Sequence, residues 1–276
     1  MGQILFVVWR ESVEAMLVIG ILYSWLRHNP AGRSGLPWLW GGVGLGVALA
    51  GALGAGILFF DESLSSEGQD YFKLAMTTAA SALIVQMVIW MRRHGRTLKK
   101  DMESGLAARS AAGRWWGVTT LTALAVAREG SETVVFLYGM GLGQQGLTLA
   151  SFAAVAVSGV ALAVATYWLL QKGGRMISWR FFFRLTEGLL LLLAASLLMN
   201  SVEQLISLDL VPALVDPLWD SSALIDDSST MGSLFATFTG YRSHPALTML
   251  LAYVGYWLAV YKLTRPSAAP AERVAA

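Results

Sequence analysis

Cysteine is absent from the 276-residue sequence. Its absence excludes disulfide bonds, thiolate metal sites, iron–sulfur clusters and cysteine nucleophiles. Any metal site must therefore use oxygen or histidine ligands. Histidine is also scarce, with three residues in the whole chain, and we expect none of them inside a membrane span. Carboxylates therefore remain as the main candidate metal ligands.

Charge is scarce as well, since charged residues make up 14% of the chain and hydrophobic residues 55%. This composition is typical of a bundle of membrane helices. A span needs about 20 mainly apolar residues to cross the roughly 30 Å hydrocarbon core. We predict an all-α integral membrane protein, one domain over residues 1–276, with seven transmembrane helices near 4–26, 38–60, 71–91, 115–139, 147–170, 185–206 and 246–261.

The loops between these spans differ in charge. Assigning alternate loops to one side of the membrane gathers most of the 20 basic residues on that side. The positive-inside rule makes this side cytoplasmic. We therefore expect the N-terminus outside and the C-terminus inside. Acidic residues gather on the outer side, where they should attract cations.

Two predicted spans contain charged residues in the identical spacing Arg-Glu-x-x-Glu. Their side chains are Arg10, Glu11 and Glu14 in the first span and Arg128, Glu129 and Glu132 in the fourth. Each ionised group near the bilayer centre costs about 2.5–3.5 kcal/mol on insertion scales, so such residues either pair or line a wet pathway. Together they carry more negative than positive charge, which suits a bound cation.

Helical geometry indicates how these charges are arranged. Residues three or four apart lie on one face of a helix, so Glu11 and Glu14 should project together. By the same spacing the arginine of each motif can reach the second glutamate, which leaves the first glutamate freer. The alternative interpretation is that each motif is an internal salt bridge that only fixes helix packing.

The two motifs are separated by three spans, so their helices run in opposite directions. This indicates an inverted three-plus-three repeat with a seventh helix, an architecture common among secondary transporters with a mid-membrane site. We assign residues 1–95 to the first repeat, 115–206 to the second, 207–245 to an outer loop and 246–264 to the seventh helix. Gly42 and Gly46 form a Gly-x-x-x-Gly pattern, which favours close helix packing.

The sequence resembles the oxidase-dependent iron permease family, which includes fungal high-affinity iron permeases and bacterial Efe-type iron permeases. Five segments carry the resemblance, which covers nearly the whole chain: residues 10–14, 128–132, Trp90-Met91-Arg92-Arg93, Thr186-Glu187-Gly188 and Leu218-Trp219-Asp220. It implies that the motif glutamates bind iron as it crosses, beside the motif arginines Arg10 and Arg128.

The resemblance also implies the setting. The protein would be a multi-pass iron importer of the cytoplasmic membrane, most simply a bacterial one, and not an enzyme. Iron would be its substrate, with no permanently bound cofactor. Its partners would be the lipid bilayer and extracytoplasmic proteins that oxidise or deliver iron, with no nucleic acid. The number of subunits stays open. Without the resemblance, hard carboxylate oxygens suit manganese or another hard divalent cation equally well.

Several further acids are secondary candidates for metal ligands. Glu187 and Glu203 lie near the two ends of the 185–206 span, and Glu187 could instead pair with Arg184 one turn earlier. The outer loop offers four aspartates that could capture metal or simply be hydrated: Asp216, Asp220, Asp226 and Asp227. Met87 and Met91 share one face of the 71–91 span, which we attribute to packing and not to a soft-metal relay.

Overall fold

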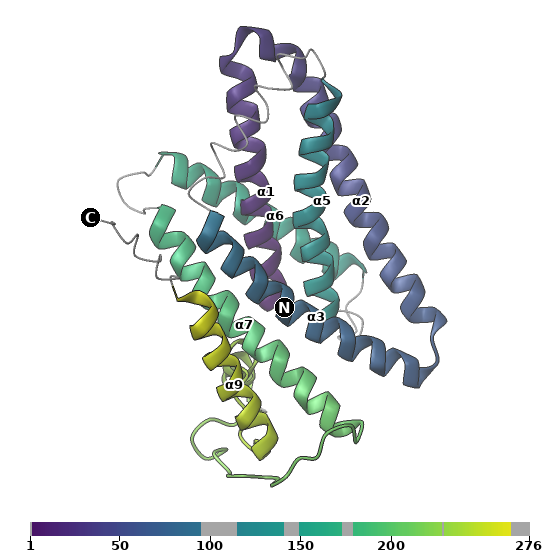
Figure 1. Ribbon diagram of the computed structural model, residues 1–276, viewed down its shortest axis with the longest axis vertical. Helices are drawn as coiled ribbons and strands as arrows, with labels where there is room; N and C mark the ends of the chain where they lie inside the picture. The colour runs from purple at the N-terminus through teal and green to yellow at the C-terminus, as the bar shows by residue number, and fades with distance from the viewer. Residues whose placement is uncertain (1, 95–114, 141–148, 173–178, 228, 266–276) are drawn as a thin grey trace, which may run out of the picture.

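The computed structural model describes residues 2–94, 115–140, 149–172, 179–227 and 229–265. These residues are helical apart from short connections and the outer loop, as predicted (Figure 1). The elements in chain order are α1 (Gly2–His28), the short 3-10 helix η1 (Pro30–Gly35), α2 (Leu36–Ser63), α3 (Ser66–His94), α5 (Trp116–Gly139), α6 (Leu149–Lys172), α7 (Trp179–Ser207), α8 (Thr230–Thr239) and α9 (Leu247–Thr264).

Each segment predicted as a membrane span overlaps one long helix. Among the described residues, four helical segments are long and apolar enough to cross a membrane: Gly32–Ser63, Ser66–Arg92, Phe183–Ser207 and Leu247–Thr264. The chain is therefore a helical membrane protein with several candidate spans. The number seven and the orientation of the termini remain predictions.

The motif charges explain why α1 and α5 are not among these four. Each helix carries one arginine and two glutamates within five residues, so a window long enough to span the bilayer contains too much charge to be recognised by composition. In α6 the apolar stretch with described side chains, Ala154–Leu169, is shorter than a full span.

Small residues allow α2 to pack along α5 and α6 to pack along α1. A Cβ atom added to Gly46 of α2 would lie 2.7 Å from the Cβ of Val126 in α5. A Cβ added to Gly159 of α6 would lie 2.7 Å from Cγ1 of Val8 in α1. The Gly-x-x-x-Gly pattern of α2 is thus used for packing within the chain, because Gly42 also contacts α5.

A second group of helices consists of α3, α7 and α9, which lie obliquely to α1, α2 and α5 (Figure 1). The Ser81 hydroxyl of α3 donates a hydrogen bond of 2.8 Å to the carbonyl of Ala194 in α7. Tyr256 of α9 donates one of 2.7 Å to the carbonyl of Leu191. The main apolar core lies where these helices meet α1 and α5, around Phe136.

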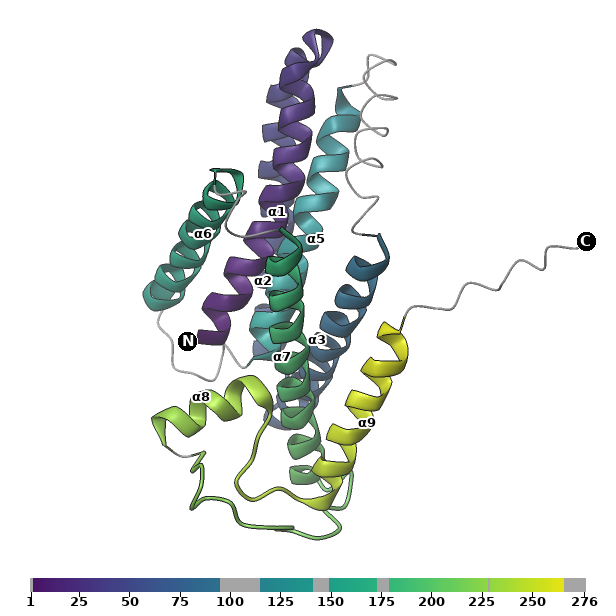
Figure 2. The same ribbon diagram turned by 90° about the vertical axis from the view of Figure 1, so that its left-hand side faces the viewer.

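The outer loop contains one helix that the sequence did not lead us to expect, α8, which lies near the start of α1 (Figure 2). Its ends are well capped: the Ser229 hydroxyl accepts the N–H of Gly232, and Gly240 ends the helix in the left-handed conformation with φ 73°. Such caps stabilise a ten-residue helix that is marginal on its own. The Gln3 side chain donates to the carbonyl of Thr237, which ties α8 to α1.

The close approach of α2 to α5 predicts that two neighbouring glycines of α2 differ in their tolerance of alanine. Gly46→Ala should lower the free energy of unfolding by about 1–3 kcal/mol, because the new methyl overpacks a filled interface. Gly44→Ala is the matched control, since nothing lies within 4 Å of its Cβ position. Thermal unfolding of both variants in detergent measures the difference, and equal stabilities would contradict the packing.

Candidate metal site

The two motifs meet because α1 and α5 contact each other along part of their lengths. One carboxylate oxygen from each of Glu11, Glu14 and Glu129 lies within 4.8 Å of the other two. Three carboxylates from two helices therefore converge. Glu132 belongs to the same motif as Glu129 but contributes no oxygen to this close group.

Each motif arginine pairs with the glutamate four residues later, as the helical spacing predicted. Arg128 Nε lies 2.9 Å from Glu132 Oε1, and Arg10 forms an ion pair with Glu14. Arg10 also donates a 2.8 Å hydrogen bond to Glu11 Oε1. Arg10 is thus shared by both glutamates of its motif, so the expectation of a freer first glutamate does not hold there.

Burial differs between the two arginines. The side chains of Arg10 and Glu11 are each only 2% exposed, whereas that of Arg128 is 41% exposed. The first motif is therefore enclosed by protein, and the guanidinium of the second lies at the protein surface. A buried ion pair needs close geometry and further hydrogen bonds to offset the loss of hydration.

Several carboxylate oxygens at this site lack such bonds. Oε2 of Glu11, of Glu129 and of Glu132 is buried and has no hydrogen-bond partner among the described residues. An unpaired buried polar atom usually costs about 1–3 kcal/mol. Buried carboxylate oxygens that lie close together and lack hydrogen bonds are suited to bind a cation, which would supply the missing interaction.

Residues of α3 complete the surroundings of both arginines. The Arg10 guanidinium donates to two thioether sulfurs, from Nη1 to Met87 Sδ at 2.9 Å and from Nη2 to Met91 Sδ at 3.0 Å. The Arg128 guanidinium carbon lies 4.4 Å from the centroid of the Trp90 ring, a cation–π contact. These roles were not predicted from the sequence, although Met87 and Met91 were expected to share one face of their helix.

The two secondary glutamates of α7 are both ion-paired. Glu187 Oε2 lies 3.0 Å from Arg92 Nε of α3. The alternative partner predicted from spacing was Arg184 on the same helix. The observed partner lies on α3, whose position relative to α7 cannot be inferred from spacing within one helix. Glu203 Oε2 lies 3.0 Å from Arg242 Nη2 in the outer loop, far along α7 from Glu187.

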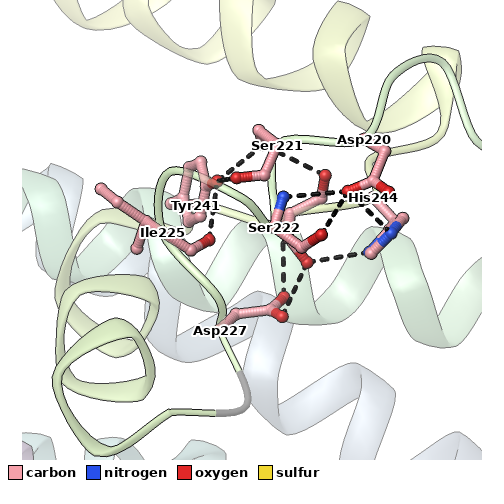
Figure 3. Close-up of polar contacts among 8 residues, drawn as sticks. Asp220, Ser221, Ser222, Ile225, Asp227, Tyr241 and His244 are labelled. Carbon is pink, nitrogen blue, oxygen red and sulfur yellow. Dashed lines mark hydrogen bonds and ion pairs between the residues drawn. The ribbon is translucent and has the colours of Figure 1, made fainter.

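The outer-loop aspartates do not converge with the motif glutamates. Asp220 and Asp227 organise the loop itself (Figure 3). Asp220 accepts the N–H and hydroxyl of Ser222 and lies 3.1 Å from His244 Nε2. Asp227 accepts the hydroxyl of Ser243 at 2.7 Å. Asp216 and Asp226 are exposed. Within the described part of the chain, no group of three loop carboxylates comes as close together as the motif glutamates do.

A family model with the description "Iron permease FTR1 family" matches residues 1–266. The chain belongs to the iron permease FTR1 family. A protein named ferrous iron permease EfeU from Escherichia coli strain UTI89 is 28% identical over 253 residues, which cover 90% of this chain and 89% of the relative. The protein of the same name from Yersinia pestis is 26% identical over 257 residues, covering 91% and 88%. No solved structure matches the chain.

Membership in the iron permease FTR1 family confirms the resemblance inferred from the two motifs. It establishes a membrane permease and not an enzyme, with iron as the family's substrate. The match extends well beyond the motifs, since it covers both predicted repeats, the whole outer loop and the seventh predicted helix. Which residues of this permease handle the ion is a separate question.

Hydrogen bonding in the outer loop predicts a pH dependence. The Ser243 hydroxyl and N–H stabilise the carboxylate form of Asp227 and hold its pKa below the ordinary value. A lowered pKa in the folded state stabilises the loop above the unfolded pKa, about 3.9 for aspartate, and this stabilisation is lost as the pH falls further. We expect hydrogen exchange in residues 220–244 to be slow at pH 6 and to accelerate, after correction for the intrinsic rate, below about pH 4.

Ser243→Ala should raise the pKa of Asp227 and move this acceleration to higher pH. Ser233→Ala, which changes an exposed serine of α8, is the control and should leave the profile unchanged. Identical profiles for Ser243→Ala and the unsubstituted protein would show that the Asp227–Ser243 contact does not hold the loop.

Proposed function

We propose that the protein imports iron across the cytoplasmic membrane through the carboxylates of Glu11, Glu14, Glu129 and Glu132. The observation that carries the proposal is the convergence of three of these carboxylates within 4.8 Å. Carboxylate oxygens are hard donors that suit hard cations. The family supplies the choice of iron.

Charge balance supports a divalent form of the ion. If all are ionised, the four glutamates exceed the two motif arginines by two negative charges, which one divalent ion would neutralise. The relatives from Escherichia coli and Yersinia pestis are named ferrous iron permeases, which agrees with this count. We therefore propose Fe²⁺ as the ion that occupies the site.

The arginines act as counter-ions of the empty site in this proposal. Arg10 bonds Glu11 and pairs with Glu14, so an arriving cation competes with a guanidinium already in place. Such competition lowers the net affinity for the ion, and a transporter must release what it binds. Extracytoplasmic proteins that deliver iron would act before this step, outside the membrane.

We further propose seven spans arranged as an inverted repeat, with the N-terminus outside. Support comes from the helix pairs, since exchanging α1 with α5 and α2 with α6 converts the α2–α5 contact into the α6–α1 contact. The contact of Gly46 with Val126 corresponds to that of Gly159 with Val8 under the same exchange. Packing alone does not require the same close pair twice.

The motif proposal predicts a loss of transport in near-isosteric variants. Glu11→Gln and Glu129→Gln should each reduce Fe²⁺ uptake into proteoliposomes at least about tenfold, because each removes a proposed ligand and the loss of a mere outer-shell partner already costs about tenfold. Glu67→Gln, an exposed glutamate in the first turn of α3, is the control. Uptake of radioactive iron at matched protein content gives the rates.

Two outcomes would overturn the proposal. Undiminished uptake in both motif variants would remove the glutamates from the pathway. Uptake of manganese that iron does not inhibit would favour the alternative substrate, another hard divalent cation.

The orientation predicts the location of two reporter fusions. A reporter joined after residue 100, which lies outside the described residues, should be cytoplasmic. A reporter joined after Asp227 should be extracytoplasmic. Alkaline phosphatase and green fluorescent protein fusions, active on opposite sides of the membrane, measure both positions. The reverse pattern would contradict the inward direction of iron movement along the motif helices.

A further inference from the structure

A third arginine–glutamate pair lies beside the motifs but differs from them in construction. The motif pairs are formed within one helix, four residues apart. The pair of Arg92 and Glu187 joins two helices, α3 and α7, at 3.0 Å. The Glu187 side chain is 11% exposed, while that of Arg92 is 40% exposed. The acid is therefore enclosed and its counter-ion reaches the surface.

This pair is connected to the motif site in two ways. The α3 helix, which is joined to α7 by the Arg92–Glu187 pair, also packs against the motif helix α5. Arg92 directly follows Trp90 and Met91, whose side chains contact Arg128 and Arg10. The last turns of α3 thus contact both motif arginines and the α7 carboxylate, so a shift of this segment would act on all of them.

The pair also lies at corresponding ends of its two helices. Arg92 is two residues before the end of α3, and Glu187 is about 12 Å along α7 from its first residue, Trp179. In the proposed orientation both helix ends face the cytoplasm. Glu14, in turn, is farther along α1 from the outer end than Glu11. A cation that moves inward from Glu11 to Glu14 would therefore approach Glu187 next.

We propose that Glu187 is the cation-binding carboxylate that follows Glu14 on the inward path, with Arg92 as its displaceable counter-ion. This inference rests on the proposed transport through the motif glutamates. A carboxylate this enclosed requires a positive partner, because an unpaired buried charge is strongly unfavourable. Arg92 supplies that partner when no ion is present, and the arriving ion takes its place.

The difference in exposure gives the exchange its direction. Arg92 can release Glu187 and move its guanidinium into the aqueous phase beside the end of α3, since its side chain is already 40% exposed. The Glu187 carboxylate cannot follow, because its side chain is buried. When the ion leaves, Arg92 pairs with Glu187 again and closes the path with a positive charge that repels cations. No bond other than coordination and ion pairing is made or broken.

A purely structural role for the pair makes a different prediction about position. An ion pair that only stabilises the packing of α3 against α7 needs opposite charges at positions 92 and 187, in either order. A cation-binding residue on the path needs its carboxylate at the enclosed position 187, whereas a carboxylate at 92 would lie on the more exposed side. Reversing the two charges therefore separates the alternatives.

The experiment measures Fe²⁺ uptake into proteoliposomes and equilibrium Fe²⁺ binding to the same purified protein. We expect Glu187→Gln to reduce the maximal uptake rate at least tenfold, with less than a threefold change in binding affinity at the motif site. Glu187→Asp, which retains the carboxylate, should recover part of the rate. Glu67→Gln is again the matched control.

The double variant Arg92→Glu with Glu187→Arg provides the decisive comparison. We expect it to fold, as judged by its thermal unfolding in detergent, but to transport as poorly as Glu187→Gln. Uptake restored to the rate of the unsubstituted protein would show that the pair is only structural and would overturn the proposal. If the double variant fails to fold, Glu187→Gln transporting at the full rate would overturn the proposal by itself.

Failure of the underlying function has a separate signature. If the unsubstituted protein does not transport iron, or if Glu11→Gln transports as well as it does, the motif proposal fails. If Glu11→Gln abolishes uptake while Glu187→Gln leaves it intact, only the role of Glu187 fails.

Discussion

The pairing of guanidinium and carboxylate groups inside α1 and α5 is the constraint on which the rest of the structure depends. Each ionised group in a span is costly on its own, and the i, i+4 spacing allows each helix to neutralise one glutamate by itself. The remaining glutamates, Glu11 and Glu129, need other partners. Glu11 shares Arg10, while Glu129 turns toward the carboxylates of α1. Charge therefore determines which faces of α1 and α5 meet.

The contact between α1 and α5 constrains how the neighbouring helices pack. With their charged faces turned toward each other, α1 and α5 require apolar cover elsewhere, and α6 and α2 supply it at close range. Glycine at 159 and at 46 allows the approach, because any side chain there would collide with Val8 or Val126. The α3 helix then covers the arginines with two thioethers and an indole ring, groups that are apolar in bulk yet interact favourably with a guanidinium.

Local spacing predicted what one helix can arrange alone. The positions of the long helices followed from runs of apolar residues, and the two i, i+4 ion pairs followed from helix periodicity. The contacts of Met87, Trp90 and Arg92 could not be predicted in this way, since each crosses to another helix and depends on helix crossing and rotation. Glu187 illustrates the limit: sequence spacing suggested Arg184 on its own helix, whereas packing brings Arg92 of α3 to it.

The contacts of the outer-loop aspartates also could not be predicted from local sequence spacing. Their number suggested a cation-collecting surface, which remains compatible with their exposure. Their hydrogen bonds, however, depend on serines and a histidine distant in sequence: Ser243 for Asp227, and His244 for Asp220. The capped helix α8 between them was likewise hidden within a segment whose composition indicated only a long acidic loop.

The counter-ions also bear on how a site of four carboxylates can release its ion. Oxygen ligands that are all free and ionised would hold a divalent cation tightly, and a transport site must also let it go. Arg10 is enclosed with Glu11 and Glu14, so in the proposed function it competes with the ion for their oxygens and reduces the advantage of the bound state. Arg128 and Arg92 are each about two-fifths exposed and can exchange between carboxylate and water. An enclosed counter-ion at Glu11 and Glu14 and an exposed one at Glu187 would weaken the hold on the ion along the proposed path from Glu14 to Glu187.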